Sequence, residues 1–349
     1  MSLTDFRTLG RSGLVVSPLV LGTMTFGTPV WGSDDASSRS IFDAYRSAGG
    51  NFIDTADVYS GGRSEEMIGQ FIADSGSRDE LVLATKFGFN AKPGNPHAGG
   101  NGAKNIHRAL EGSLRRLKTD YIDLYWMHVW DGVTPIEEIM QTLGDLVRAG
   151  KIRYFAFSDM PAWVAAKAGT MACERRIPGP IAMQLEYSLV ARDIEREHLP
   201  VAHEFGMALM PWSPLAGGFL SGKYEPADTV QKGRLSGANP FGNSKFTPAN
   251  WATLAVLRNI AREQNVTVSQ AALAWVTARP GVTATLVGAH NIAQLQDNIT
   301  ALKVVLTATH IASLNEVSAI NPGFSGSLTS SAIRRMIFGG HTVRGWGEP

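Results

Sequence analysis

The sequence predicts a single α/β domain that folds as a (β/α)8 TIM barrel. The chain has 349 residues, which is long enough for one such barrel with insertions. Short apolar runs of strand length alternate along it with segments of helical periodicity. The runs lack strict polar alternation, as is typical of a parallel sheet covered on both faces. No linker or internal repeat divides the chain, so we expect residues 1–349 to form one domain.

The predicted strands are apolar runs rich in β-branched and aromatic residues. Residues 6–17 come first and are expected to form a hairpin cap that turns between Gly10 and Gly13. Eight barrel strands follow, at 18–23, 51–55, 81–86, 121–127, 152–157, 181–186, 207–212 and 284–288. Eight is the number at which a parallel sheet of this kind closes on itself.

Helical segments fill the intervals between the strands. One begins with capping residues at 33–35 and ends at Gly49. Another, at 106–118, places its apolar residues three or four apart on one face. A third opens at Pro135 and ends at Gly150, since proline suits the first turn of a helix and glycine its end.

Three segments interrupt this rhythm, and all are expected on the strand-to-helix side of the barrel. They are the loop at 88–103, a cofactor loop at 213–249, and a Gly/Ser-rich tail at 321–349 predicted to lie near the barrel mouth. Long loops in a compact domain are usually functional or mobile. On this side of a barrel, loops build the active site.

Composition narrows the class of protein. The formal net charge is +1, which gives no reason to expect nucleic acid or an anionic membrane as a partner. The single cysteine, Cys173, excludes an intramolecular disulfide and fits a reducing compartment. The N-terminus does not resemble a signal peptide, and no apolar run approaches the ~18 residues of a membrane span. We therefore expect a cytoplasmic protein, as a monomer or weak homo-oligomer.

Four polar residues follow consecutive predicted strands: Asp54, Tyr59, Lys86 and His128. Strands in a parallel barrel end at one rim, so the four side chains are expected to meet there. Reduction of a carbonyl requires a proton donor and hydrogen bonds aimed at the oxygen. A lysine beside the tyrosine is expected to lower the phenol pKa, a carboxylate to hold that lysine, and the histidine to supply a second donor.

In these residues the chain resembles the aldo-keto reductase superfamily, in the branch of potassium-channel β subunits and microbial reductases. The matching stretches are NFIDTADVYSGGRSEEMIG, LVLATK, DLYWMH, MQLEYSL, PWSPLAGGFLSGKY and VGAHNIAQLQDNI, which lie between residues 51 and 299. The resemblance implies Asp54, Tyr59, Lys86 and His128 as catalytic residues. It also implies a nicotinamide cofactor, NADPH in the first place with NADH as the alternative, and no metal.

The resemblance further implies which residues hold the cofactor. Trp212 is expected to stack on the nicotinamide and Gln184 to bond its carboxamide. The complete expected set is Gly22, Thr23, Met24, Asp54, Ser158, Asp159, Gln184, Trp212, Ser213, Pro214, Leu215, Gly217, Lys223, Arg234, Gly288, His290, Gln294 and Asn298.

Two positions depart from the family pattern. Asp159 stands where the family usually has asparagine; a carboxylate accepts from the carboxamide NH₂ group but cannot donate to its oxygen. Gln294 stands where many members carry an arginine that grips the 2′-phosphate. The change removes one charge-assisted contact of roughly 1.5–3 kcal/mol.

The expected substrate is a small carbonyl compound, bulky or cyclic, such as a sugar, a steroid-like ketone or a trichothecene-type ketone. Its pocket is expected to include Phe26, Trp31, Phe87 and Trp130. Three alternatives stay open: alcohol oxidation by the same site, a nucleotide-binding regulatory subunit of the channel-β type, and a hydrolase. The last would need paired carboxylates, and the adjacent Glu65 and Glu66 make a poor pair.

Overall fold

The computed structural model describes residues 1–28, 32–226, 235 and 245–344. The chain divides into two compact units, Met1–Ser318 and Ala319–Pro349. The first unit contains the sheet and all the predicted site residues.

The larger unit is a parallel barrel, as predicted. Its strands pair in the order β10-β3-β4-β5-β6-β7-β8-β9, all of them parallel. A further bridge between Leu209 and Val282 brings β9 back toward β10 and nearly closes the ring. The strands are β3 (Leu19–Gly22), β4 (Phe52–Asp54), β5 (Val82–Phe87), β6 (Ile122–Met127), β7 (Ile152–Ser158), β8 (Ala182–Glu186), β9 (Ala208–Trp212) and β10 (Thr285–Val287). Each overlaps a predicted strand.

Side chains alternate along these strands between the barrel interior and the layer beneath the helices. The interior cluster contains Phe52, Val82, Ala84, Leu124 and Trp126, among others. Their immediate neighbours, such as Ile53, Leu83 and Tyr125, pack in the outer cluster instead. Asp54, Lys86 and His128 lie two positions after Phe52, Ala84 and Trp126 of the interior cluster. Their side chains therefore point into the barrel at its carboxyl end, which is where the site lies.

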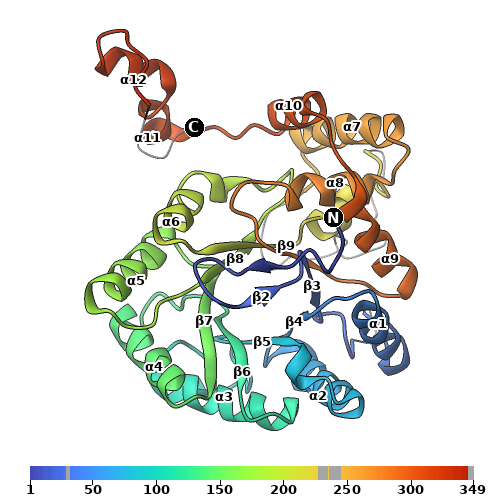
Figure 1. The fold of residues 1–349 in the computed structure, drawn as a ribbon, viewed down its shortest axis with the longest axis vertical. Coiled ribbons are helices and arrows are strands. Elements are labelled where there is room, and N and C mark those ends of the chain that lie inside the picture. Colours follow the sequence, from blue (N-terminus) through green and yellow to red (C-terminus); the bar gives the residue numbers. More distant parts are fainter. Residues whose placement is uncertain (29–31, 227–234, 236–244, 345–349) are drawn as a thin grey trace. The chain divides into compact units, whose positions relative to one another are not determined.

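The predicted hairpin caps the opposite end of the barrel (Figure 1). It consists of β1 (Arg7–Thr8) and β2 (Val15–Val16), which pair antiparallel. Leu9 and Val16 are fully buried in the interior cluster, so they fill this end of the barrel. Gly10 is required at the turn: its φ is +60°, and a Cβ there would lie 2.5 Å from the carbonyl oxygen of Ile181.

Helices surround the strands (Figure 1). The three helices predicted above form as α1, α3 and α4, and Asp34 caps α1 by accepting from the Ser37 N–H. The helices of the larger unit are α1 (Asp35–Ser47), α2 (Arg63–Ser75), α3 (Ala103–Leu117), α4 (Ile136–Arg148), α5 (Ala162–Arg175), α6 (His198–Phe205), α7 (Pro248–Glu263), α8 (Val268–Thr277), α9 (Ile292–Thr300) and α10 (Ala308–Val317).

Short 3₁₀ helices shape several loops. They are η1 (Tyr59–Gly62), η2 (Arg78–Glu80), η3 (Pro96–Ala98), η4 (Asp193–Glu195), η5 (Ala216–Ser221) and η6 (Ala301–Lys303). Of these, η1 carries Tyr59 directly after β4, and η5 begins the predicted cofactor loop after β9.

The smaller unit is helical where the sequence predicts a Gly/Ser-rich tail. It contains α11 (Gly323–Leu328) and α12 (Ser331–Ile337). The Ser330 side chain caps α12 by accepting from the Ile333 N–H at 3.4 Å, a local signal that outweighs the surrounding glycines. The position of this tail relative to the barrel mouth stays a prediction.

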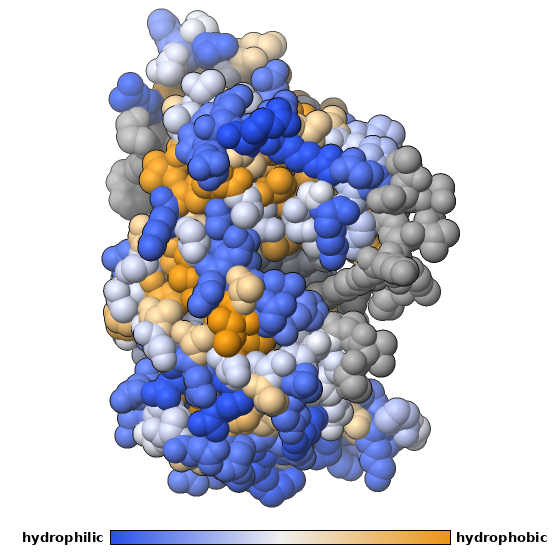
Figure 2. Space-filling view, turned by 90° about the vertical axis from the view of Figure 1, so that its right-hand side faces the viewer, coloured by the Kyte–Doolittle hydropathy of each residue, from blue (hydrophilic) through white to orange (hydrophobic). Residues whose placement is uncertain are grey.

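The face of the molecule in Figure 2 is mostly hydrophilic, and its apolar side chains gather in separate patches. No helix within the described part of the chain is both long and apolar enough to cross a bilayer.

Candidate active site

The four predicted catalytic residues meet at the carboxyl end of the barrel. Asp54 ends β4, Lys86 lies near the end of β5, and His128 directly follows β6. Tyr59 begins η1, the short helix that turns the chain from β4 into α2. Asp54 and Lys86 are fully buried. The strand ends thus converge as the sequence predicts.

The Lys86 ammonium group is at the centre of this group of side chains. Its Nζ donates to Asp54 Oδ1, to the Thr55 carbonyl oxygen at 3.0 Å and to the Tyr59 hydroxyl at 3.4 Å. Three acceptors match the three N–H bonds of a protonated lysine. The lysine therefore joins the carboxylate to the phenol.

Burial and pairing act in opposite directions on these groups. Burial disfavours the charged lysine, but the Asp54 carboxylate and Tyr59 outweigh it and raise the pKa of Lys86. Burial raises the pKa of Asp54, and the Lys86 charge opposes that rise. The lysine consequently keeps its proton at neutral pH.

Lys86 lowers the pKa of Tyr59, as expected, but burial outweighs this influence and the net shift is upward. Burial raises the pKa of the Tyr59 phenol, and the opposing influence of Lys86 is smaller. A phenol surrounded by protein loses the solvation that a phenolate needs. Tyr59 is thus protonated at neutral pH, which is the form that a proton donor requires.

His128 lies across the mouth from this group. Its ring meets the Tyr59 ring edge-on with centroids 5.8 Å apart, and the Phe89 ring likewise at 4.8 Å. Burial, together with the nearby Lys86 charge, holds the pKa of His128 well below its usual value. The imidazole is therefore neutral, and its buried Nδ1 has no hydrogen-bond partner among the described residues.

The ends of β7 and β8 add amide- and hydroxyl-bearing side chains. Gln184 Nε2 donates to Asp54 Oδ2 at 3.1 Å, which links β8 to the Asp54 carboxylate. No other described residue bonds to the side-chain amide of Gln184, so its Oε1 atom is free to accept. The buried Ser158 Oγ has no hydrogen-bond partner in the described part of the chain.

Asp159 and Trp212 bond directly to each other, which the sequence does not predict. The indole Nε1 donates to Asp159 Oδ1 at 3.0 Å. The Asp159 backbone N–H donates to the Gln184 backbone carbonyl oxygen at 3.3 Å, so Asp159 is held by residues of both β8 and β9. Its φ is +44°, a left-handed conformation that asparagine and aspartate tolerate better than most residues.

The predicted cofactor loop turns tightly after β9. Ser213 Oγ accepts from the Gly217 N–H at 2.9 Å, while Pro214 is buried and Leu215 half-buried. Gly217 and Gly218 both have positive φ, and Lys223 is exposed beyond them. The turn thus combines exposed lysine charge with a backbone that can approach an anion closely. Arg234 lies outside the described residues.

The predicted phosphate end lies between β10 and α9. Asn298 is buried and donates to the Gly288 carbonyl oxygen at 3.2 Å. Gln294 is exposed, and its Oε1 accepts from the His290 N–H at 2.9 Å. This bond uses only Oε1, so the two Nε2 N–H groups of this exposed side chain stay available as donors.

The remaining predicted cofactor residues follow β3. Gly22 lies opposite Asp54 in the pairing of β3 with β4. Thr23 is buried and its hydroxyl donates to the Asp54 carbonyl oxygen at 3.1 Å, so that donor is already used within the protein. Met24 is half-buried beside it.

The predicted substrate pocket consists of aromatic residues, but two of them face elsewhere. Phe26 and Phe87 are fully buried in the layer beneath the helices, since Phe87 follows the inward-pointing Lys86 on β5 and must point outward. They are core residues and do not line a mouth. Trp130 is half-buried, and Trp31 lies outside the described residues.

Two tryptophans near the site were not expected from the sequence. Trp163, at the start of α5, is 55% exposed and meets the Trp130 ring edge-on with centroids 5.1 Å apart. Trp126 points into the barrel below Asp54; its Nε1 has no hydrogen-bond partner among the described residues, yet it lies close enough to favour the Asp54 charge. The sequence could have indicated this position of Trp126, because it lies two residues before His128 and residues two apart share one face of a strand.

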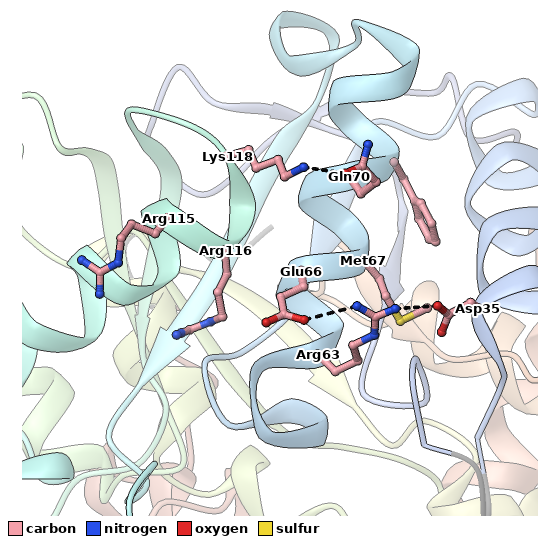
Figure 3. Close-up of a pocket in the computed structure, with 9 residues that line it drawn as sticks. Asp35, Arg63, Glu66, Met67, Gln70, Arg115, Arg116 and Lys118 are labelled. Carbon is pink, nitrogen blue, oxygen red and sulfur yellow. Dashed lines mark hydrogen bonds and ion pairs between the residues drawn. The ribbon is translucent and has the colours of Figure 1, made fainter.

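A separate cavity of about 470 Å³ lies between α2 and α3, on the outside of the barrel (Figure 3). Its charged groups are held by neighbouring side chains: Arg63 bonds to Asp35 and Glu66, and Lys118 donates to the Gln70 amide oxygen. Glu65 is buried and bonded by Arg116, whereas Glu66 is exposed, so the two carboxylates do not form a catalytic pair. None of the four converging residues lines this cavity, and we assign it no catalytic role.

Residues 18–319 match the model of the aldo/keto reductase family. The chain belongs to the aldo/keto reductase family. It is accordingly an NAD(P)H-dependent oxidoreductase, and the four converging residues occupy the rim where barrel enzymes place their chemistry.

Named relatives cover most of the chain. It is 34% identical to an aryl-alcohol dehydrogenase of Pestalotiopsis microspora, over 91% of this chain and 83% of the relative. It is 35% identical to the norsolorinic acid reductase stcV of Emericella nidulans, over 90% and 81%. It is also 35% identical to a probable voltage-gated potassium channel subunit beta of Oryza sativa subsp. japonica, over 86% and 92%.

The groups at the mouth fit the carboxamide of a nicotinamide. A carboxamide offers two N–H donors and one acceptor oxygen. The unpartnered Ser158 hydroxyl can donate to the oxygen, while the Gln184 carbonyl and the Asp159 carboxylate can accept from the nitrogen. Donors and acceptors are therefore present in the right number.

Proposed function

We propose that this aldo/keto reductase reduces a bulky or cyclic aldehyde or ketone to the alcohol, with NADPH as its cofactor and Tyr59 as general acid. The observation that carries the proposal is the Lys86 ammonium bonded to both Asp54 and the Tyr59 hydroxyl. When bound, the nicotinamide supplies the hydride.

The residues divide the remaining work. Negative charge develops on the carbonyl oxygen, and Tyr59 gives its proton to that atom. Lys86 stabilises the phenolate left behind, and Asp54 keeps Lys86 charged and oriented. The neutral His128 ring donates a second hydrogen bond to the oxygen and positions the substrate.

Binding of the nucleotide is assigned to the rim between β7 and α9. Ser158, Asp159 and Gln184 hold the carboxamide, and Trp212 stacks on the ring. The Gly217 turn and Lys223 receive the pyrophosphate, because backbone N–H groups and a lysine suit that anion. Gly288, His290, Gln294 and Asn298 surround the adenosine end, and the free Nε2 donors of Gln294 support the choice of NADPH.

The substrate class is supported by the aromatic surface of Phe89, Trp130 and Trp163 and by the relatives that act on aryl alcohols and norsolorinic acid. Aromatic walls favour a bulky, cyclic or aryl carbonyl over a highly charged one. We infer a cytoplasmic enzyme that acts as a monomer or weak homo-oligomer, and the same site catalyses alcohol oxidation when the oxidised nucleotide predominates.

The test is titration of the purified protein with NADPH and with NADH, followed by nucleotide fluorescence, and then a screen of carbonyl substrates. Tight binding of NADPH and turnover of a ketone or aldehyde are expected. A preference for NADH would contradict the cofactor choice, and binding of neither would contradict the reductase function.

A regulatory role is the second candidate, because one relative is named as a channel subunit. Such a role predicts nucleotide binding without turnover of any carbonyl in the screen, together with co-purification of a membrane partner.

A further inference from the structure

The bond between Asp159 and Trp212 joins two residues of the proposed nucleotide site that come from different strands. Asp159 follows β7, Trp212 ends β9, and β8 with Gln184 lies between them. The indole Nε1 donates to Oδ1 at 3.0 Å, which leaves Oδ2 able to accept from another donor. A single carboxylate can thus fix the indole and contact a ligand at once.

We propose that ionised Asp159 is a positioning residue, which holds the Trp212 indole in place and accepts from the nicotinamide carboxamide, so that nucleotide affinity depends on the charge of this carboxylate. The inference rests on the proposed function, since it concerns the same nucleotide site. An ionised carboxylate is an acceptor only, whereas the protonated acid commits one oxygen as a donor. Only the ionised form can accept from the indole and the carboxamide together at full strength.

The surroundings of Asp159 bring this ionisation into an accessible pH range. The residue is exposed at the mouth, yet enough protein crowds its carboxyl group to raise the pKa of Asp159 to about 6. The Trp212 hydrogen bond and the Lys86 charge oppose the rise, whereas the Glu186 carboxylate adds to it.

Among the described residues, few other charged groups surround Asp159. Glu186, on β8, is itself paired with Lys245 at 2.7 Å. The Ser158 hydroxyl lies close enough to the carboxylate to oppose the rise in the pKa of Asp159. His198 on α6 contacts the Met160 carbonyl oxygen at 2.8 Å. The Tyr59 phenol also lies within the field of Asp159, which contributes to its raised pKa.

The experiment measures the Kd of NADP⁺ by calorimetry from pH 5 to pH 8, for the natural protein and for Asp159→Asn. Asparagine adopts the same left-handed backbone and still accepts from the indole, but it does not titrate. The ratio of the two Kd values cancels the titration of the nucleotide's own phosphate. With a pKa of about 6, the natural protein loses affinity relative to the variant by about fourfold at pH 5.5 and about tenfold at pH 5.0.

A ratio that stays constant from pH 5 to pH 8 would overturn the inference while leaving the reductase function intact. Failure of both proteins to bind NADP⁺ at pH 8 would overturn the proposed function and this inference with it. A second variant, Trp212→Phe, keeps an aromatic ring but removes the N–H donor. In this variant, the pH at which half of the NADP⁺ affinity is lost is expected to be higher than in the natural protein, because the ionised carboxylate has lost a stabilising bond. An unchanged half-loss pH would contradict the role of the indole.

Discussion

Two groups of paired charges lie on opposite faces of the same strand. On the inner face of β5, Lys86 bonds to Asp54 and Tyr59 at the open end of the barrel. On the outer face, the preceding residue Thr85 donates to the buried Glu65 at 2.6 Å, and Arg116 bonds to the same carboxylate. The residue types are similar, but only the inner group can meet a substrate.

The difference teaches that position on the strand, more than residue type, decides the role. Asp57 belongs to the outer group although it lies between Asp54 and Tyr59 in the sequence. It is almost fully buried, and neither of its carboxylate oxygens has a hydrogen-bond partner among the described residues. We therefore expect changes in the inner group to affect chemistry and changes in the outer group to affect stability.

The largest effect is expected from Tyr59→Phe. Removal of the proton donor should lower kcat by about 10²–10⁴-fold, the usual contribution of a general acid. The Kd of NADPH should stay within about twofold, because the ring and its packing against His128 remain. Single-turnover kinetics with the best substrate of the screen would measure this; near-normal kcat would remove Tyr59 from the proposed chemistry.

Asp57 is expected to make stability depend on pH. Burial and the charge of Glu65 raise the pKa of Asp57 to about 7, with Arg116 and Arg108 opposing. The folded protein thus holds this proton more tightly than the unfolded chain, so the contribution is present at low pH and is lost as pH rises through about 7. The free energy of unfolding should rise by about 1.4 kcal/mol per pH unit from pH 7 down to pH 5. Urea unfolding of the natural protein and of Asp57→Asn at several pH values would test it. An equal change of unfolding free energy with pH in both proteins would contradict the assignment.

Glu65→Gln tests the outer group directly. The substitution keeps the shape of the side chain but weakens its bonds to Thr85 and Arg116, which should cost about 1–3 kcal/mol of unfolding free energy. The value of kcat/KM should stay within about twofold, because Glu65 does not reach the barrel mouth. A large loss of kcat/KM with unchanged stability would break the distinction between the two faces.

Trp163→Ala is expected to have the smallest effect and to separate substrate contact from chemistry. Loss of the edge-on contact with Trp130 should raise KM for an aromatic aldehyde by about two- to tenfold. A small aliphatic aldehyde serves as the control, and its KM should not change. Equal effects on both aldehydes would place Trp163 outside the substrate surface.

Much of this arrangement could be predicted from the sequence. The strand periodicity gave all eight barrel strands, and parallel strands necessarily bring Asp54, Lys86 and His128 to one rim. The pairing of Lys86 with Asp54 followed from the same reasoning.

The failures have physical causes. Phe87 was expected in the pocket because it lies near a strand end, but its phase relative to Lys86 directs it into the helix layer. The direction of the Tyr59 pKa shift depends on how deeply the phenol is buried, which one sequence cannot report. The bond between Asp159 and Trp212 joins residues more than fifty positions apart and follows no local pattern.

The hairpin that fills one end of the barrel has a consequence for the order of events in a catalytic cycle. Leu9 and Val16 are buried in the interior cluster and fill the far end of the barrel, so a molecule that contacts Asp54 must approach from the carboxyl rim. Where a second molecule covers the first, we expect the molecule nearer Asp54 to bind first and to leave last. The closed end of the barrel therefore favours ordered binding and release, in which the outer molecule leaves before the one nearest Asp54.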